Sequence, residues 1–518
     1  MPKPRRIPLA MKTRILLFLI TLVCAAAASM PSVYAATITV QDTGDGTANA
    51  ANCPGSGCRL RDALAAATDG DTINFSVTTP ATITLTSGQL VVGNSVAISG
   101  PGADQLSVNG NAASLVFYIN SGLTVTISGL TITNGSADNG SGIYNDHSNL
   151  TVSSSTVSDN SASYGGGIFN DGGFDGLSFA SLTINNSTVS GNSASVIGGG
   201  ILNFGPDGIV DLTINNSTVS GNLATSGGDG GGIYNDGFDG LADLTINNST
   251  VSGNSATSGG GIYNSGGGFP PFFQGLATVT IQDTILNAGA SGENIYNDSG
   301  AVTSQGYNLS SDNGGGFLTA TGDQINTNPM LGPLQDNGGP TFTHALLSGS
   351  PAIDKGDPNF NPNDFNPPML YDQRGPGFPR VVNNRIDIGA FEVQTIVCPQ
   401  GKGYWKNNPN AWPVNSLMLG SQTYTKAQLL TILMTPIKGD ASLILADQLI
   451  AAKLNIASGA DGTPVTSTIT HADFLLSSFS GKLPYKVKPS TSTGQAMVND
   501  AATLNDYNNG LLTSGCGG

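Results

Sequence analysis

The stretch LTINNSTVSGN, residues 182–192, decides the fold because it returns unchanged at Leu212 and Leu244. A looser copy, LTVSSSTVSDN, begins at Leu150, so successive copies start 32, 30 and 32 residues apart. A fixed period of about 20 to 50 residues is typical of solenoids, propellers and helical arrays. The middle of the chain is therefore predicted to repeat one supersecondary unit.

A second motif alternates with the first and ends each time in asparagine. Its copies read SGIYN, GGGIFN, GGGILN, GGGIYN, GGGIYN and ENIYN, and they end at Asn145, Asn170, Asn203, Asn235, Asn264 and Asn297. Glycine permits the positive φ that a sharp bend requires. Asparagines stacked ~4.8 Å apart can hydrogen-bond in a ladder. The first motif offers a second ladder at Asn192, Asn222 and Asn254.

The residue types choose among the repeat architectures. Leu182, Ile184 and Val189 alternate with polar residues, which predicts short strands with one buried face. Strong helix formers are scarce, which excludes helical solenoids, and a propeller blade needs about 40 residues or more. Strands this short bury a face only by stacking. We therefore predict a mostly β protein with a parallel β-helix from Thr72 to about Asn326, in roughly eight or nine coils.

The first 35 residues differ from the rest. They carry five Lys and Arg residues, an apolar run over 15–28, and Val33-Tyr34-Ala35 with small residues at the −3 and −1 positions. This pattern is typical of a secretory signal peptide cleaved after Ala35. The apolar run is shorter than the ~20 residues that a membrane span needs, and no later run is long enough, so no transmembrane span is expected.

Charge is sparse and unevenly placed. The formal net charge is −16, and loss of the five N-terminal cations would leave −21. No Lys or Arg occurs between Arg61 and Lys355, whereas eight Lys and six Asp follow Cys398. Nucleic-acid binding needs clustered cations that release counterions. The acidic middle of the chain therefore excludes a nucleic-acid partner there.

Four cysteines remain after the signal segment, and an even number in an exported chain indicates disulfides. Four cysteines allow three pairings. The simplest joins Cys53 to Cys58 and Cys398 to Cys516. A zinc site is the alternative, but no histidine lies near either pair in the sequence.

Three stretches resemble bacterial families. Over roughly residues 130–297 the repeats resemble those of the chlamydial polymorphic outer-membrane proteins, and more widely those of right-handed parallel β-helix proteins. CRLRDAL, from Cys58, resembles the core of the CSLREA domain over residues 37–75. NPMLGPLQDNGGPTFTHALLSGSPAIDKGDP and DQRGPGFPRVVNNRIDIGAFE closely resemble the choice-of-anchor Q domain. These resemblances imply a right-handed coil displayed on the cell surface, including the outer membrane, or released from it.

Open coil ends should be covered, so both flanks are interpreted as caps. Leu60 to Ala67 is predicted to be a short helix in which Arg61 pairs with an acidic group. Residues 307–392 are predicted to close the other end. The resulting segments are a signal peptide, an N-terminal cap, β-helix repeats, a closing domain and a helical domain of unknown role, at 1–35, 36–75, 76–306, 307–397 and 398–518.

The last segment is rich in Leu, Ala and Lys, which predicts a small all-α domain. Thr425 and Gln428 form a capping box, and Asp440 can cap the apolar-striped helix that follows it. Trp405 and Trp412 can stack on sugar rings, but core packing is the favoured interpretation.

Aspartates form two columns on the coil. Asp175, Asp207 and Asp239 each precede glycine and lie 32 residues apart, as do Asp211 and Asp243 at strand entrances. One coil of separation places column members ~5 Å apart. Solvated turns are the favoured interpretation. Calcium, a natural cation for such ligands, is the alternative at Asp175, Asp207 and Asp239, and no cofactor is required otherwise.

Enzymatic chemistry has weak support. A uronate lyase needs a cation and usually an Arg or Lys base, and the repeats contain neither. His147 and His344 have no recognisable Ser or Cys partner motif, so a triad is not indicated. A glycoside hydrolase needs only two carboxylates, for which Asp207, Asp211, Asp239 and Asp243 are the candidates.

The sequence therefore predicts a secreted or surface-displayed β-helix that acts as a monomeric, non-enzymatic scaffold or adhesin. Its Ser/Thr/Asn flank is the expected contact face for an extracellular glycan or protein. The alternative is a calcium-assisted polysaccharide hydrolase that uses the aspartate columns.

Overall fold

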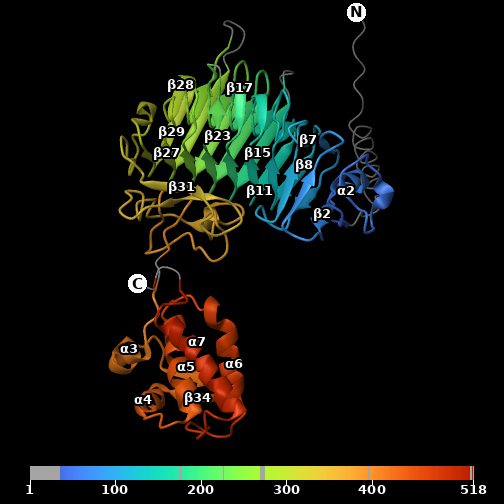
Figure 1. Cartoon of the computed structure of the whole chain (residues 1–518). Coiled ribbons are helices and arrows are strands. Elements are labelled where there is room, and N and C mark those ends of the chain that lie inside the picture. Colours follow the sequence, from blue (N-terminus) through green and yellow to red (C-terminus); the bar gives the residue numbers. More distant parts are fainter. Residues whose placement is uncertain are drawn as a thin grey trace, which may run out of the picture. The chain divides into compact units, whose positions relative to one another are not determined.

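The computed structural model describes residues 35–173, 178–225, 227–268, 275–394, 397–513 and 516 (Figure 1). The chain separates into two compact units. The first ends at Val393 and is mostly β, and the second begins at Gln394 and is mostly helical.

The first unit is a right-handed parallel β-helix, as the sequence predicts. Parallel connections of this kind are almost always right-handed. Neighbours in its ten-stranded sheet come from successive coils. In spatial order they are β1 (Thr37–Val40), β2 (Thr72–Phe75), β5 (Ala97–Ser99), β8 (Thr124–Ser128), β11 (Asn149–Ser153), β15 (Phe179–Asn185), β19 (Ile209–Asn215), β23 (Leu241–Asn247), β26 (Leu276–Gln282) and β29 (Ala301–Gly306).

Two further long sheets form the other sides of the coil, and a three-stranded corner sheet is added in its middle part. The nine-stranded sheet holds β3 (Ala81–Thr84), β6 (Leu106–Asn109), β9 (Thr131–Thr133), β12 (Thr156–Ser158), β16 (Thr188–Ser190), β20 (Thr218–Ser220), β24 (Thr250–Ser252), β27 (Ile285–Asn287) and β30 (Leu309–Ser310). The eight-stranded sheet holds β4 (Leu90–Val92), β7 (Phe117–Ile119), β10 (Ile143–Asp146), β14 (Ile168–Asp171), β18 (Ile201–Phe204), β22 (Ile233–Asp236), β25 (Ile262–Ser265) and β28 (Ile295–Ser299). The corner sheet holds β13 (Ser161–Tyr164), β17 (Ser193–Ile197) and β21 (Leu223–Ala224).

The repeated motif stacks in register, which confirms the prediction from its period. Leu182, Leu212 and Leu244 lie opposite one another on successive strands, each at most 1% exposed. Full burial of such a side chain contributes about 1.5 to 3 kcal/mol. The equivalent isoleucines and valines form parallel columns, and together these columns are the core of the coil.

Both predicted asparagine ladders are present inside the coil. The Nδ2 atom of Asn170 donates to Oδ1 of Asn203 at 2.7 Å, and Asn203 donates in the same way to Asn235 at 2.8 Å. Asn192 and Asn222 repeat the pattern at 2.9 Å in the second ladder. These side chains are at most 1% exposed. The ladders therefore satisfy polar groups that burial would otherwise leave unpaired.

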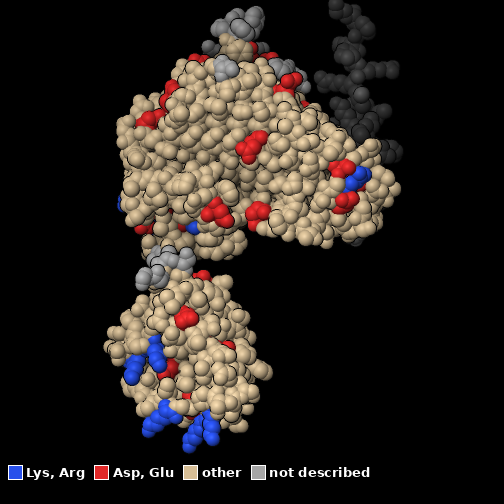
Figure 2. Space-filling model, in the orientation of Figure 1, with Lys and Arg blue, Asp and Glu red and all other residues tan. Residues whose placement is uncertain are grey.

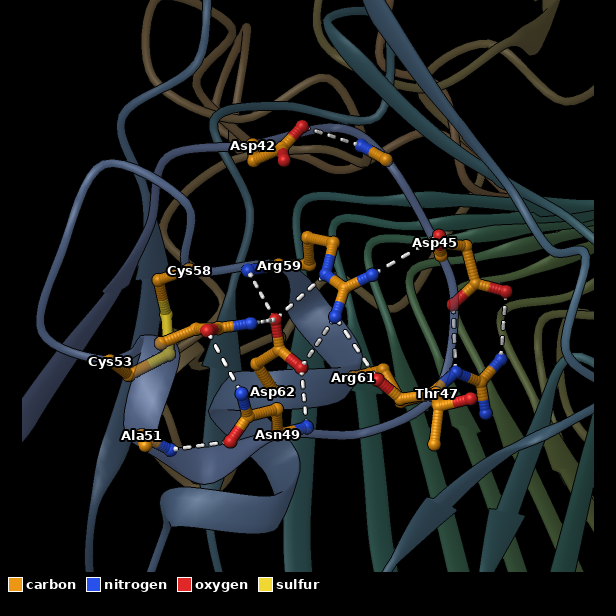
Figure 3. A network of polar contacts seen from close by, with 12 residues as sticks. Asp42, Asp45, Thr47, Asn49, Ala51, Cys53, Cys58, Arg59, Arg61 and Asp62 are labelled. Atoms are coloured by element: carbon orange, nitrogen blue, oxygen red, sulfur yellow. Dashed lines mark hydrogen bonds and ion pairs between the residues drawn. A yellow bond between two sulfur atoms is a disulfide. The ribbon is translucent and has the colours of Figure 1, made fainter.

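The N-terminal end is covered by α2 (Leu60–Ala66), which is amphipathic as predicted. Figure 3 shows Arg59 and Arg61 directed at two aspartates. Arg59 pairs with Asp62 and Arg61 with Asp45, both at 2.7 Å, so the predicted acidic partner of Arg61 is Asp45. Burial raises the pKa of Asp62, but hydrogen bonds from Arg59 and Asn52 outweigh it and hold that pKa at about 2.

The four cysteines form the two predicted disulfides. The S–S bond of Cys53 and Cys58 lies in the cap, and that of Cys398 and Cys516 encloses the helical unit. The alternative zinc site therefore has no thiolate ligands from these residues.

The segment expected to close the second end does two things. Leu318 packs into the coil core at that end, and Gln324 forms an isolated parallel bridge with Leu309 of β30. The hairpin of β31 (Leu331–Gln335) and β32 (Thr343–Leu346) and the chain up to Glu392 instead return along the outer face of the nine-stranded sheet. We call residues 331–392 the strap, which lies below the sheets in Figure 1. It covers a column of threonines, so that flank of the coil is not a free contact face.

The second unit contains α3 (Lys402–Asn407), α4 (Lys426–Met434), α5 (Ala441–Ala457), α6 (Thr466–Ser477) and α7 (Ser492–Asn508), together with a hairpin of β33 (Ser416–Leu419) and β34 (Gln422–Thr425). The predicted caps at Thr425 and Asp440 are present. Trp405 and Trp412 are 3% and 7% exposed, so both belong to the core rather than to a sugar platform. In the described part of the chain, no helix has both the length and the apolar character to cross a bilayer.

Candidate functional site

The outer face of the eight-stranded sheet carries a column of aromatic residues. Along β10, Ile143 and Asn145 face inward and are fully buried, whereas Tyr144 and Asp146 face outward. In-register stacking continues this outer column over seven strands, through Tyr118, Tyr144, Phe169, Leu202, Tyr234, Tyr263 and Tyr296. The middle position of the repeated motif therefore forms one column of mostly aromatic side chains, which the buried Phe169 and Leu202 interrupt at the surface.

The first rings of this column are well ordered by stacking. The ring centroids of Tyr118 and Tyr144 are 5.2 Å apart with an interplanar angle of 12°. Phe169 follows at 5.1 Å in an edge-on arrangement. Offset and edge-on pairs of this kind are stabilising beyond the area they bury. The first two rings are therefore held as one rigid offset stack, which we call the tyrosine platform.

Two carboxylates orient these rings through their hydroxyl groups. Tyr118 Oη donates to Asp146 at 2.7 Å, and Tyr144 Oη donates to Asp171 on the next strand. Burial, reinforced by the hydrogen bond to Asp146, raises the pKa of Tyr118 to about 12. Burial and the bond to Asp171 raise the pKa of Tyr144 further. Both phenols therefore stay protonated and neither serves as a general base near neutral pH.

A groove of about 770 Å³ lies against this platform. Its walls are the turns that precede β4, β7 and β10 in three successive coils, at residues 87–89, 113–115, 136–137 and 139. They contribute serine hydroxyls, the Asn139 amide and the Gln89 side chain. The volume lies within the range of about 300 to 1,000 Å³ that is typical of small-ligand sites. The groove thus combines flat rings with many neutral polar groups.

The N-terminal cap holds one wall of the groove in place. Arg61 donates to the carbonyl oxygens of Gly88 and Gln89, both at 2.6 Å. Asp45 accepts from the backbone N–H groups of Thr86 and Ser87 at 2.7 and 3.0 Å. The pair drawn in Figure 3 therefore fixes the turn that enters β4.

The predicted column of Asp211 and Asp243 is real but lies elsewhere. The two residues are opposite one another on β19 and β23, on the outer face of the ten-stranded sheet. Burial and the charge of Asp243 raise the pKa of Asp211. Thr278 Oγ1 donates to Asp243 at 2.5 Å. The structure thus pairs these carboxylates but does not bring them to the tyrosine groove.

The second aspartate column occupies turns. Asp207 and Asp239 both adopt left-handed backbone conformations, with φ of 58°. Asp175 lies outside the described residues. Within the residues that the structure describes, no group of three or more His, Cys, Asp or Glu side chains is arranged to hold a metal ion. Calcium binding at these turns therefore remains a prediction from the sequence.

The structure brings together one pair that the sequence did not indicate. Ser220 on β20 and Nε2 of His344 on β32 are 2.8 Å apart, and Nδ1 of His344 lies 2.8 Å from the Gly332 carbonyl oxygen. Donation from Nδ1 to that carbonyl leaves Nε2 as the acceptor for the serine hydroxyl. Ser220 is only 5% exposed beneath the strap. The pair therefore joins the strap to the coil and does not form an accessible nucleophile.

The groove was only partly visible in the sequence. Tyr144 stands in the I-Tyr-N motif, which predicted strands and asparagine ladders, whereas Tyr118 lies between Phe117 and Ile119, outside that motif. Strict alternation would also have placed those rings outside the coil. The groove walls, however, come from the turns of the first three coils, whose sequences do not repeat.

Comparison with known proteins adds little. No protein-family model and no curated protein matches the chain. A solved structure described as the crystal structure of pectate lyase Pel9A is similar, with a TM-score of 0.36 and 14% sequence identity over 70% of this chain and 98% of that chain. Function therefore has to be inferred from the geometry of the site.

Proposed function

We propose that the coil binds a neutral extracellular glycan in the tyrosine groove. The observation that carries the proposal is the stacked Tyr118–Tyr144 platform that lines the groove. An aromatic ring presents an apolar face for the C–H side of a sugar, and its hydroxyl ties the ring in one orientation. Serine and amide groups on the walls supply hydrogen bonds to sugar hydroxyls.

The charge of the site favours an uncharged ligand. Asp146 and Asp171 lie beside the rings, and the nearest arginine of the groove wall, Arg61, is paired with Asp45. A carboxylate or sulfate on the sugar would meet negative charge without a compensating cation. Neutral sugars avoid this repulsion.

The wider setting is inferred from the disulfides and the sequence resemblances. Two disulfides are typical of oxidising compartments. We infer a secreted scaffold of the kind that carries CSLREA and choice-of-anchor Q domains. In this interpretation the cap and the strap protect the coil, and the groove supplies the adhesive contact.

Titration tests the binding site. A glycan array identifies neutral ligands, and calorimetry then compares the wild type with Tyr118→Ala and Tyr144→Ala. Each variant is expected to lose about tenfold in affinity, which corresponds to ~1.4 kcal/mol. Tyr404→Ala is the matched control, because Tyr404 is 41% exposed in the other unit. Equal losses in all three variants, or no neutral ligand on the array, would contradict the proposal.

A second candidate, glycoside hydrolysis at Asp211 and Asp243, is favoured by one observation. Asp211 has a raised pKa beside a second carboxylate, which is the arrangement of an acid and a nucleophile. A reducing-sugar assay on the array ligands separates the two functions. Turnover that Asp211→Asn and Asp243→Asn both abolish would establish the enzyme, whereas binding without turnover supports the scaffold.

A further inference from the structure

The helical unit holds eight of the 14 Lys and Arg residues that follow residue 35, in a chain that is otherwise acidic. Two of its eight lysines are in ion pairs, Lys402 with Asp447 at 3.1 Å and Lys453 with Asp473 at 2.6 Å. Within the described residues the other six are in no ion pair with an acidic side chain, namely Lys406, Lys426, Lys438, Lys482, Lys486 and Lys488.

Backbone contacts gather three of these lysines at one end of the unit. The N–H groups of Lys486 and Val487 donate to the Asp440 carboxylate at 2.9 and 3.0 Å. These bonds hold the segment that carries Lys486 and Lys488 against the turn that carries Lys438. All three side chains are exposed. Figure 2 shows lysine side chains projecting together from one end of this unit.

Acidic residues are excluded from the same surface. Residues 422–439 and 478–499 contain no Asp or Glu. The adjacent Asp440 is 9% exposed and accepts from the Ser442 N–H at the start of α5. The Asp440 carboxylate therefore points inward. The two segments that carry the exposed lysines hold no acidic side chain that could offset their positive charge.

A pocket of about 260 Å³ opens beside these lysines. Lys482 stands at its edge, where its Nζ donates to Gln428 Oε1 at 2.7 Å and lies 5.0 Å from the Tyr424 ring centroid. The lining includes the hydroxyls of Thr431 and Thr435. Apolar contacts come from Ile432, Leu443, Leu483 and Pro484. The pocket thus offers one positioned cation, neutral hydroxyls and an apolar floor.

We propose that this lysine surface binds an anionic polysaccharide, with one acidic sugar in the pocket beside Lys482. Acid groups on neighbouring sugars then pair with Lys486, Lys488 and Lys438. The apolar floor suits the carbon face of a sugar ring, and the hydroxyls suit its oxygens. The acid group of the sugar is a carboxylate or a phosphate, both of which an ammonium group binds.

Two features favour a polysaccharide over a nucleic acid. All cations of the helical unit are lysines, so the planar fork with which arginine contacts phosphates and guanines is missing. The coil that accompanies this surface is acidic and would repel a polyanion as densely charged as duplex DNA. The proposed ligand differs in charge from the neutral glycan of the tyrosine groove and uses separate residues.

Binding of the purified full chain to polygalacturonate, a polysaccharide that carries carboxylates, and to phosphomannan, a polysaccharide that carries phosphates, tests the proposal at low salt. Affinity for at least one polymer is expected to fall steeply with added NaCl. Lys486→Gln/Lys488→Gln is expected to weaken binding about tenfold. The matched pair Lys355→Gln/Lys406→Gln removes the same charge from exposed lysines elsewhere and should stay within about twofold. Lys482→Gln should abolish binding of galacturonate, a single acidic sugar that occupies only the pocket.

Three outcomes would overturn the proposal: no binding of either polymer, equal weakening by the two double variants, or tighter binding of duplex DNA than of both polymers. Tyr118→Ala should leave polyanion binding unchanged, so a failure here is distinguishable from a failure at the groove. Because the substituted lysines are exposed, the melting temperature verifies that each variant is folded.

Discussion

Arg61 belongs to the N-terminal cap, yet its guanidinium donates to two carbonyl oxygens on the groove wall. Arg61→Gln removes the ion pair with Asp45 and both of these bonds. We expect about a fivefold loss of glycan affinity together with a lower melting temperature. Arg61→Lys keeps the charge without the planar fork, so its affinity should be intermediate.

Arg385 supplies the control for this prediction. It clamps the carbonyl oxygens of Gly356 and Lys355 in the strap at 2.7 and 3.1 Å. Arg385→Gln should therefore lower the melting temperature while leaving glycan affinity unchanged. Parallel losses of affinity in both variants would show that Arg61 acts through general stability and does not position the wall.

The pair of His344 and Ser220 predicts an acid-sensitive contact. Burial lowers the pKa of His344 below its usual 6.5, opposed by the bond to Gly332. Because the pKa of His344 is lower in the folded state than in the unfolded state, the stability that neutral His344 contributes is present above pH ~6.5. This stability is lost as the pH falls through the folded-state pKa. The melting temperature should therefore drop between pH 7.5 and pH 5. In His344→Gln the drop should be smaller, and an unchanged drop would exclude this histidine as its source.

Among the elements of the coil, the asparagine ladder offers the clearest test of stacking. Asn222 donates to Asn254 and to the Val189 carbonyl oxygen, and it accepts from the backbone and side chain of Asn192. Asn222→Ala leaves buried polar groups on both neighbouring coils unpaired. The free energy of unfolding should therefore fall by about 2 to 3 kcal/mol. Denaturant titration measures this loss. Asn215→Ala, in the outward-facing column, should cost well under half as much.

The strap contains one of the buried carboxyl groups that respond to alkali, Glu392; Asp283 in the coil, with a pKa raised by burial to about 7, is another. Burial raises the pKa of Glu392 to about 8, against the opposing charge of Arg380. A raised folded-state pKa means that stability is complete below the unfolded pKa of about 4.5 and is lost as the pH rises through 8. Melting temperatures should therefore fall between pH 6 and pH 9. In Glu392→Gln the fall in melting temperature between pH 6 and pH 9 should be smaller than in the wild type. An equal fall in both proteins would show that Glu392 is not its source.

Coil and strap differ in how far the sequence predicts them. Leu182, Leu212 and Leu244 recur at a nearly fixed period, so stacking and register follow from the repeat itself. The strap has no period, and its contacts span long separations, such as the bond from Gln373 to Thr188 across 185 residues. The groove falls between these cases. Its Tyr144 follows the repeat, but Tyr118 and the walls depend on the irregular sequence of the first coils.

At the scale of the whole molecule, the two units carry their interactions separately. We propose that the coil binds through rings and neutral polar groups in the groove, and that the helical unit binds through lysines. Within the helical unit, α5 packs against α7, and the core of this unit is distinct from that of the coil. We therefore expect two unfolding transitions, each assignable to one unit.

The bond between Cys398 and Cys516 assigns these transitions. It links residues 118 positions apart, whereas Cys53 and Cys58 are separated by five. In the chain-entropy account a loop of about 100 residues contributes ~4 to 5 kcal/mol, and a short loop contributes much less. The double variant Cys398→Ser/Cys516→Ser should therefore lower one calorimetric transition strongly and leave the other in place. Cys53→Ser/Cys58→Ser should shift the remaining transition slightly. If both transitions shifted in the first variant, the two units would unfold together. A crosslink confined to one unit changes only the transition of that unit when the two cores unfold independently.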